Sequence, residues 1–244
     1  MGDRTDSHSV LASVFRGHVL DPLADAQAVV QREATEIDSE REAFDQLAQR
    51  VMDIETVPDR QPEPQAHTLT VESQLQTADQ LREAYQETVM DVPHFEDVYG
   101  ESLETNVAAE LPPDVAVLFE DPADQITPDQ KTRIRAAVTN ARASRETLAA
   151  NLVDEQESLA TAHDELEAVI TRLDGPHVPG RYSDQFEDTL TTTIHTRQEM
   201  LADRSHRSRA DGHDLCHYLY PDQEWTYPVL TAVARLRSAV ECPE

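Results

Sequence analysis

The sequence predicts an all-α protein, an elongated helical bundle with two long helices of the coiled-coil type and smaller helical caps. Along two long segments, apolar side chains recur about every 3.5 residues, the spacing of a helix that packs along its length against another helix. Proline and glycine stand at the ends of these segments. No stretch alternates apolar and polar residues as a half-buried strand does, so a sheet is not expected.

The first long helix is expected from about Pro22 to Glu55. Asp21 can accept a hydrogen bond from the first free N–H groups, and Pro22 has the backbone angle that suits a first helical turn. Residues 1–20 are then a tail or a short helix, and the prolines from Pro58 onward end the long helix. The apolar seam of this segment, the row of side chains expected to face another helix, includes Leu23, Val30, Ile37, Phe44 and Val51.

The second long helix is expected from Pro128 to Leu173. Thr127 is its predicted N-cap, Gln130 completes a capping box, and Gly175 marks its end. Its apolar seam includes Ile134, Val138, Leu148, Leu152, Leu159, Leu166 and Leu173. The two seams are expected to pack together, either as an antiparallel hairpin within one chain or as a coiled coil between chains.

Three parts follow one another along the chain. They are the N-terminal tail or short helix 1–20, the long-helix bundle 21–173 and a C-terminal helical cap 174–244. A helical insertion at about 61–126 separates the two long helices.

The smaller helices are predicted from shorter apolar patterns. In the insertion we expect a helix from Val71 to about Met90, a shorter one over 95–111, and one or two further turns up to Phe119. In the cap we expect a helix over about 183–204 and a last helix after Pro228.

The charge of the chain is strongly negative. There are 48 acidic and 20 basic residues, a formal net charge of −28, and Lys131 is the only lysine. Such a surface repels nucleic acid and anionic membranes. It suits a cytoplasm at molar salt, where the Debye length falls to about 3 Å and self-repulsion is screened. We therefore expect a cytoplasmic protein of a salt-in halophile. An acidic mesophilic coiled-coil protein is the alternative.

Several functional classes are not expected. The six glycines form neither GxGxxG nor GxxxxGK[ST], which argues against a nucleotide-binding fold. The longest purely apolar run, Val115 to Phe119, is far shorter than the ~20 residues that cross a bilayer. The N-terminus lacks the basic and apolar runs of a signal peptide. The catalytic strings GxSxG and HExxH are absent as well. We expect no cofactor, no membrane contact and no enzyme activity.

Four charged residues fall on the seams: Glu33, Glu40, Arg145 and Glu155. In one interpretation, Arg145 pairs with one of these glutamates across the seam and sets the alignment of the helices. In the other, which we favour, the seam drifts around the helix and these side chains reach solvent.

The C-terminal part holds a group of potential metal ligands: His213, Cys216, His217 and Cys242. Cysteine and histidine are the ligands of tetrahedral zinc sites, and residues three or four apart share one face of a helix. The chain has no CxxC pair, however, and Cys242 lies far along the sequence. We favour the interpretation that Cys216 is a small buried side chain and the histidines are exposed.

Two further groups allow two interpretations each. Arg204, Arg207 and Arg209, with Arg197 and His206 nearby, are the one basic cluster. They either contact nucleic-acid phosphates or complement the dipole at a helix C-terminus, which we favour. Four aromatic residues, Tyr218, Tyr220, Trp225 and Tyr227, either anchor a binding partner or form the core of the C-terminal cap.

Some short stretches carry a family resemblance. They are Glu42-Ala43-Phe44, Tyr85-Gln86-Glu87-Thr88-Val89-Met90, Val92-Pro93-His94-Phe95, Tyr99-Gly100-Glu101-Ser102-Leu103, Leu215-Cys216-His217-Tyr218-Leu219-Tyr220 and Thr226-Tyr227-Pro228-Val229-Leu230. Over nearly its whole length the chain resembles an uncharacterised family of haloarchaeal proteins, known only as a domain of unknown function. The resemblance implies a cytoplasmic haloarchaeal protein with a helical body rich in coiled coil. It carries over no activity, cofactor or catalytic residue.

Two functions fit these observations. We expect a non-catalytic helical interaction protein, a scaffold or adaptor whose seams bind its own second half or another protein. The alternative is a DNA-associated or transcriptional regulator that uses the basic segment 204–209 and holds a Cys/His metal site.

Overall fold

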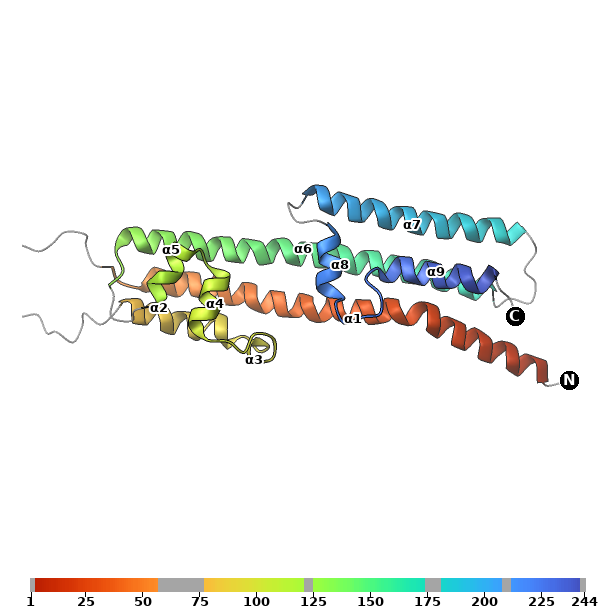
Figure 1. The fold of residues 1–244 in the computed structure, drawn as a ribbon, viewed down its shortest axis with the longest axis horizontal. Coiled ribbons are helices and arrows are strands. Elements are labelled where there is room, and N and C mark those ends of the chain that lie inside the picture. Colours follow the sequence, from red (N-terminus) through yellow and green to blue (C-terminus); the bar gives the residue numbers. More distant parts are fainter. Residues whose placement is uncertain (1–2, 57–76, 121–124, 174–180, 208–211, 242–244) are drawn as a thin grey trace, which may run out of the picture. The chain divides into compact units, whose positions relative to one another are not determined.

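The computed structural model describes residues 3–56, 77–120, 125–173, 181–207 and 212–241. Every regular element within these ranges is a helix, which confirms the predicted all-α class (Figure 1). The expected stop signals at Pro58 and Gly175, and Cys242, lie outside the described residues.

The elements in chain order are α1 (Asp3–Asp53), α2 (Thr77–Gln86), η1 (Val89–Asp91), α3 (Phe95–Val98), α4 (Leu103–Glu110), α5 (Pro113–Ala116), η2 (Val117–Phe119), α6 (Pro128–Leu173), α7 (Arg181–Arg207), α8 (Gly212–Leu219) and α9 (Pro228–Glu241). Among the described residues, no helix combines the length and the apolar character needed to cross a membrane.

Two compact units make up the chain, and each contains part of both long helices. Unit 1 comprises Met1–Ala34 and Asn151–Glu244, and unit 2 comprises Thr35–Ala150. These units are groups of packed residues. The division into the domains 1–20, 21–173 and 174–244 stays a prediction.

Helix α6 begins and ends where the sequence predicts. The Thr127 backbone N–H donates to Oε1 of Gln130 at 2.9 Å, and the Gln130 N–H donates to Oγ1 of Thr127 at 3.3 Å. This reciprocal pair is the predicted capping box, which satisfies two N–H groups that the helix itself leaves without acceptors. Because all of its atoms lie within four residues, the sequence alone was sufficient to locate it.

The predicted start of the first long helix at Pro22 is wrong, because α1 already begins at Asp3 and Pro22 lies inside it. A proline inside a helix has no N–H to give to the carbonyl four residues earlier, here His18. Nη1 of Arg235, on α9, donates to that carbonyl oxygen at 3.0 Å. Figure 1 shows α1 bending in its N-terminal part, as a helix with an internal proline does. A residue more than two hundred positions away thus replaces the missing donor.

In unit 2, α1 and α6 pack as an antiparallel pair within one chain. Glu40 of α1 pairs with Arg145 of α6, and the carbonyl of Met52, further along α1, accepts from Lys131, earlier on α6. Of the two predicted alternatives, a hairpin within one chain and a coiled coil between chains, the structure therefore has the first. The core that α2, α4, α5 and η2 complete contains Phe44, Leu47, Val51, Leu81, Tyr85, Leu103, Val107, Val115, Phe119, Ile134 and Val138.

The segment 95–111, expected to be one helix, is split into α3 and α4 at Gly100. Gly100 has φ +52°, and a Cβ there would lie 3.0 Å from the Glu96 carbonyl oxygen. Ser102 then starts α4 by accepting a hydrogen bond from the Thr105 N–H at 3.3 Å. Glycine is the residue that tolerates this left-handed conformation, so the chain turns here.

In unit 1, the first part of α1 and the second part of α6 pack with α7, α8 and α9. Helix α7 extends over 181–207, slightly beyond the predicted 183–204. Seam side chains of both long helices are fully buried in this unit: Leu23, Val30, Leu152, Leu159 and Leu166.

The burial of the predicted seams follows the expected period. In unit 2, Ile37, Phe44, Val51, Ile134 and Val138 are buried, whereas Leu148 is half-buried. The side chain of Leu173 lies outside the described ones. That these residues form an interaction seam for another protein stays a prediction.

Lys131 joins the C-terminal end of α1 to the first turn of α6. Its ammonium group donates to the carbonyl oxygens of Met52 at 2.7 Å and Ile54 at 2.6 Å. The last carbonyl groups of a helix have no intrahelical donors, and a cation at that end also complements the helix dipole.

We expect the substitution Lys131→Met to lower the free energy of unfolding by about 1–2 kcal/mol, since a charged donor to two carbonyl groups is lost while the aliphatic stem is kept. Urea unfolding followed by circular dichroism in molar KCl measures this change. Arg133 lies two residues after Lys131 on α6 and makes exposed ion pairs with Asp129 and Asp114. Arg133→Met is therefore the control and should cost about 0.5 kcal/mol or less. An equal effect of the two substitutions would contradict the role of Lys131.

Candidate functional site

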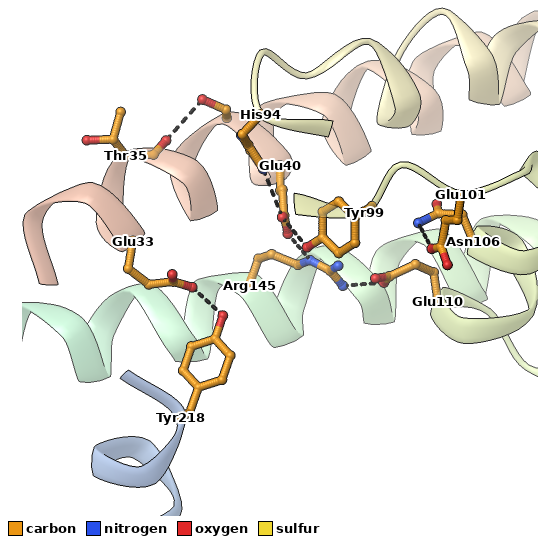
Figure 2. Close-up of polar contacts among 11 residues, drawn as sticks. Glu33, Thr35, Glu40, His94, Tyr99, Glu101, Asn106, Glu110, Arg145 and Tyr218 are labelled. Atoms are coloured by element: carbon orange, nitrogen blue, oxygen red, sulfur yellow. Dashed lines mark hydrogen bonds and ion pairs between the residues drawn. The ribbon is translucent and has the colours of Figure 1, made fainter. Parts of the chain in front are cut away.

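A buried carboxylate of α1 is the centre of the polar cluster in unit 2. Glu40 is only 6% exposed. Its Oε1 accepts a hydrogen bond from the Tyr99 hydroxyl at 2.7 Å and lies 3.2 Å from Nε2 of His94. Its Oε2 accepts from Nε of Arg145 at 3.0 Å. Figure 2 shows these side chains converging on Glu40, His94 and Tyr99 from the two ends of α3 and Arg145 from α6.

Arg145 links three helices through one guanidinium group. Besides Glu40 on α1, it binds Oε2 of Glu110 on α4, with its Nη1 at 2.6 Å from that oxygen. Its guanidinium carbon lies 4.8 Å from the centre of the Phe44 ring, in cation–π contact. Burial alone would lower the pKa of Arg145, but the hydrogen bonds and charges of Glu110 and Glu40 raise it. Arg145 is therefore a permanent cation at this position.

The partners of Glu40 also set its protonation. Burial raises the pKa of a carboxyl group, but the hydrogen bond from Tyr99 and the charge of Arg145 outweigh burial and lower the pKa of Glu40. The pKa of Tyr99 is raised by burial and by its bond to the Glu40 carboxylate. The tyrosine thus stays a donor and the glutamate stays an acceptor at neutral pH.

A second row of hydrogen bonds supports the same cluster. The Tyr85 hydroxyl donates to Oδ1 of Asn106 at 2.7 Å, and Nδ2 of Asn106 donates to Oε1 of Glu101 at 2.8 Å. The cavity beside Asn106, which Glu40, Tyr99, Glu110 and Arg145 also line, measures about 10 Å³. This is room for about one water molecule and too little for a substrate.

Unit 1 contains an independent buried ion pair. Glu155 of α6 is 0% exposed, and the Arg197 side chain of α7 is 1% exposed. The pair is bidentate, with Nη1–Oε2 at 2.9 Å and Nη2–Oε1 at 2.7 Å. The Tyr220 hydroxyl donates to the same carboxylate at 3.1 Å, and Sγ of Cys216 lies 3.7 Å from Nη2 of Arg197.

A surface cavity of about 340 Å³ lies beside this pair, between α6, α7 and α9. Asp154, Ser158, Thr193, Arg197 and Met200 are among its lining residues, whereas Glu155, Tyr220 and Cys216 do not line it. The carboxylate and thiol of the buried cluster are therefore separated from the space that a small molecule could enter.

The favoured interpretation of the charged seam positions, that they reach solvent, is wrong for Glu40, Glu155 and Arg145. The alternative, pairing of Arg145 with a seam glutamate, is what the structure shows. Glu33 is half-buried and accepts a hydrogen bond from the Tyr218 hydroxyl within unit 1 (Figure 2). These charges are held inside the bundle because each has a partner there.

The grouping of Arg197 with the basic cluster is wrong, because Arg197 is the buried partner of Glu155. A signal for this was present in the sequence. The buried stripe of α7 runs through Phe186, Leu190, Thr193, Arg197 and Leu201, which are three or four residues apart. Arg197 thus stands where the helical period requires a core residue.

The structure does not describe the side chains of the other arginines of the cluster, Arg204, Arg207 and Arg209. Their contact with nucleic acid stays a prediction. The sequence also gave no indication of which residues would surround Glu40, since Tyr99, Glu110 and Arg145 lie on separate helices or loops.

The structure does not bring the predicted metal ligands together within its described part. Cys216 is buried against Arg197, while the next residue, His217, is exposed with its ring 6.2 Å from that of Tyr227. The side chain of His213, and Cys242, lie outside the described residues. Among the described side chains, no three histidine, cysteine or acidic groups are placed to hold a metal ion.

Two of the four aromatic residues lie in the core of the C-terminal part, and a binding role of the other two stays a prediction. Tyr220 and Trp225 are buried with their ring centres 5.2 Å apart, as in the core of a cap. Tyr218 is 54% exposed and Tyr227 is half-buried.

We expect Arg197→Met to lower the free energy of unfolding by about 3–5 kcal/mol, because the Glu155 carboxylate is left buried without its counter-charge. Urea unfolding in molar KCl measures this. Replacing both partners, as Arg197→Met with Glu155→Leu, should restore part of the loss, since no buried charge remains. Arg237→Met, which breaks the partly exposed pair with Glu187, serves as the control and should cost about 1 kcal/mol or less. A double variant as unstable as the sum of the single ones would contradict this account.

The lowered pKa of Glu40 predicts a pH dependence of stability. The contribution of Glu40 is complete above the ordinary carboxyl pKa of about 4.3, and it is lost as the pH falls toward the lower pKa in the folded protein. Glu40→Gln should therefore be less stable than the wild type at pH 7, with a difference that shrinks below about pH 4.5. Urea midpoints between pH 3 and pH 7 measure this difference. Glu42→Gln, at an exposed position two residues along α1, is the control. A difference that is constant with pH would contradict the assignment.

Comparison with known proteins gives one match. No curated protein and no solved structure matches the chain. A family model described as "Domain of unknown function (DUF7260)" matches residues 21–243, almost the whole chain. This confirms the resemblance to an uncharacterised family, while a haloarchaeal origin stays a prediction. The chain belongs to the DUF7260 family of domains of unknown function.

Proposed function

We propose that this protein is a non-catalytic helical interaction protein, a scaffold or adaptor that works in the cytoplasm of a salt-in halophile. One observation supports this most directly. In both units, charged residues at seam positions join helices to one another: Glu40 with Arg145, and Glu155 with Arg197.

Buried ion pairs of this kind favour a unique arrangement of helices. Two apolar seams can slide by one heptad and still bury apolar side chains. A buried charge cannot slide, because any other register leaves it without its partner. Arg145 binds both Glu40 and Glu110, so the alignment of α1, α4 and α6 in unit 2 is set at one point. A body with such fixed helix positions offers a partner a constant surface.

The same contacts argue against an active site at these residues. Catalytic groups with altered pKa values face a cleft that admits substrate. In unit 2, Glu40, Tyr99 and Arg145, whose pKa values are altered, contact one another around a cavity of about 10 Å³. In unit 1, Arg197 lines the larger surface cavity, but its guanidinium group is already bound by the buried carboxylate of Glu155. Their altered pKa values follow from burial and from ion pairing within the fold.

The charge of the chain supports the proposed location. The net charge of −28 and the single lysine suit a cytoplasm at molar salt, where repulsion between surface carboxylates is screened. The single lysine, Lys131, has a specific structural use, because its ammonium group reaches two carbonyl oxygens at the end of α1.

A regulator that binds DNA through Arg204, Arg207 and Arg209 is the alternative. The assignment of Arg197 to the buried pair with Glu155 takes one cation away from that cluster. The test below is designed so that one of its outcomes would favour this DNA-binding regulator.

The test is affinity capture from extract of the source organism, with the tagged protein held in molar KCl throughout and with nuclease treatment in parallel. We expect at least one protein partner that is retained reproducibly after nuclease treatment and identified by mass spectrometry. Arg197→Met bait is the matched control, since its register is loosened and its capture should fall. Retention that disappears with nuclease would favour the regulator instead. Retention of no protein by the wild type would overturn the proposal.

A further inference from the structure

Two adjacent large apolar side chains are exposed at the end of α3. Val98 is 53% exposed and Tyr99 is 38% exposed. Single exposed apolar side chains are common on protein surfaces and need no explanation. In the described part of the chain, however, the other large apolar side chains that are this exposed have no such neighbour in sequence: Met52, Val117, Val153 and Tyr218.

The Tyr99 ring is held in one orientation from beneath. Its hydroxyl donates to Glu40 at 2.7 Å, and its ring lies 5.6 Å from that of the buried Phe95 and 6.3 Å from that of His94. The Gly100 N–H donates to the Phe95 carbonyl at 3.0 Å, and its positive φ turns the chain away after Tyr99. Figure 2 shows the ring beside the Glu40 carboxylate and above Arg145. Since the ring is already ordered, a partner that contacts it loses little side-chain entropy in binding.

Two exposed carboxylates, those of Glu96 and Asp97, directly precede this apolar pair on the same short helix. Neither takes part in an ion pair or hydrogen bond of its side chain in the described part of the chain. In the same unit, by contrast, the carboxylates of Asp45 and Glu104 are paired with Arg142 and Arg82. The carboxylates of Glu96 and Asp97 are therefore available to an external cation.

We propose that Val98 and Tyr99, with the carboxylates of Glu96 and Asp97, form a docking surface for an arginine-bearing segment of another protein. The proposal rests on the proposed interaction function and names the partner's chemistry. A guanidinium group can lie flat on the tyrosine ring and bind carboxylates in its plane, whereas a lysine ammonium group has no flat face to stack. An apolar side chain next to the arginine would cover Val98.

This combination of contacts remains effective at molar salt. Screening removes attraction over more than about 3 Å at that ionic strength, so only groups in direct contact with a partner contribute. Stacking on Tyr99 and direct hydrogen bonds to Glu96 or Asp97 meet that condition. A more distant acidic surface does not.

The test uses the synthetic peptide acetyl-Leu-Arg-Leu-Arg-amide, titrated in molar KCl into the isotopically labelled protein and followed by backbone amide shifts. We expect saturable shifts confined to residues near 95–101. The peptide with lysine in place of arginine should bind about threefold or more weakly, which corresponds to a modest cation–π contribution. Val98→Ser, and the double variant Glu96→Gln with Asp97→Asn, should each weaken binding about fivefold. None of these exposed positions contributes to the core, so the variants should fold.

Val117→Ser is the matched control, because Val117 is 49% exposed in the same unit but lies outside the surface. It should leave the peptide affinity unchanged. Shifts spread over the whole protein, equal binding of the lysine peptide, or an equal effect of Val117→Ser would each overturn the inference.

The two proposals fail separately. If the wild type captures a protein partner from extract and Val98→Ser captures it equally well, this docking surface is refuted while the interaction function stands. If the wild type captures no partner, the interaction function itself is refuted.

Discussion

The structure depends on the buried pairing of arginine with glutamate between helices. Removing a charge from water costs several kcal/mol, and only a partner with good geometry offsets that cost. Glu155 and Arg197 meet this condition with two hydrogen bonds, and the Tyr220 hydroxyl adds a third to the same carboxylate. Once such a pair is buried, helices that carry it have one acceptable register. The apolar seams supply most of the burial, and the ion pairs decide which of several similar arrangements is adopted.

The parts of the fold that follow from neighbouring residues could be predicted from the sequence, and the parts that depend on distant residues could not. The start of α6 is set by Thr127 and Gln130, which bond each other across one helical turn. The start of α1 was missed because Pro22 looks like a first-turn residue. It is tolerated inside the helix with Arg235 of α9 as donor to the His18 carbonyl. No local pattern connects those residues.

In the candidate site, too, the features set by residues near in sequence could be predicted, and those that depend on distant residues could not. The period of the seams identified Glu40, Arg145 and Glu155 as charges in apolar positions. It did not identify their burial, because burial depends on Glu110, Tyr99, Arg197 and Tyr220, which other elements supply. The burial of Arg197 alone could have been predicted from the sequence, since Arg197 stands on the apolar stripe of α7. Its nearness to Arg204 in sequence suggested an exposed cluster, and the helical period was the better guide.

The pairing of arginines within the chain also determines which charges remain on its surface. Arg50, Arg82, Arg142 and Arg145 of unit 2 each bind a carboxylate of the same chain. Each such pair neutralises one cation and one carboxylate, so with 20 basic residues against 48 acidic ones, one-to-one pairing of every cation would still leave 28 carboxylates unpaired. At molar salt that surface exerts no long-range attraction, so recognition depends on short-range contacts with shape and hydrogen bonds. An ordered aromatic ring that directly follows exposed carboxylates in the chain offers a contact of that kind, and the buried charge of Glu40 is what keeps the Tyr99 ring in place.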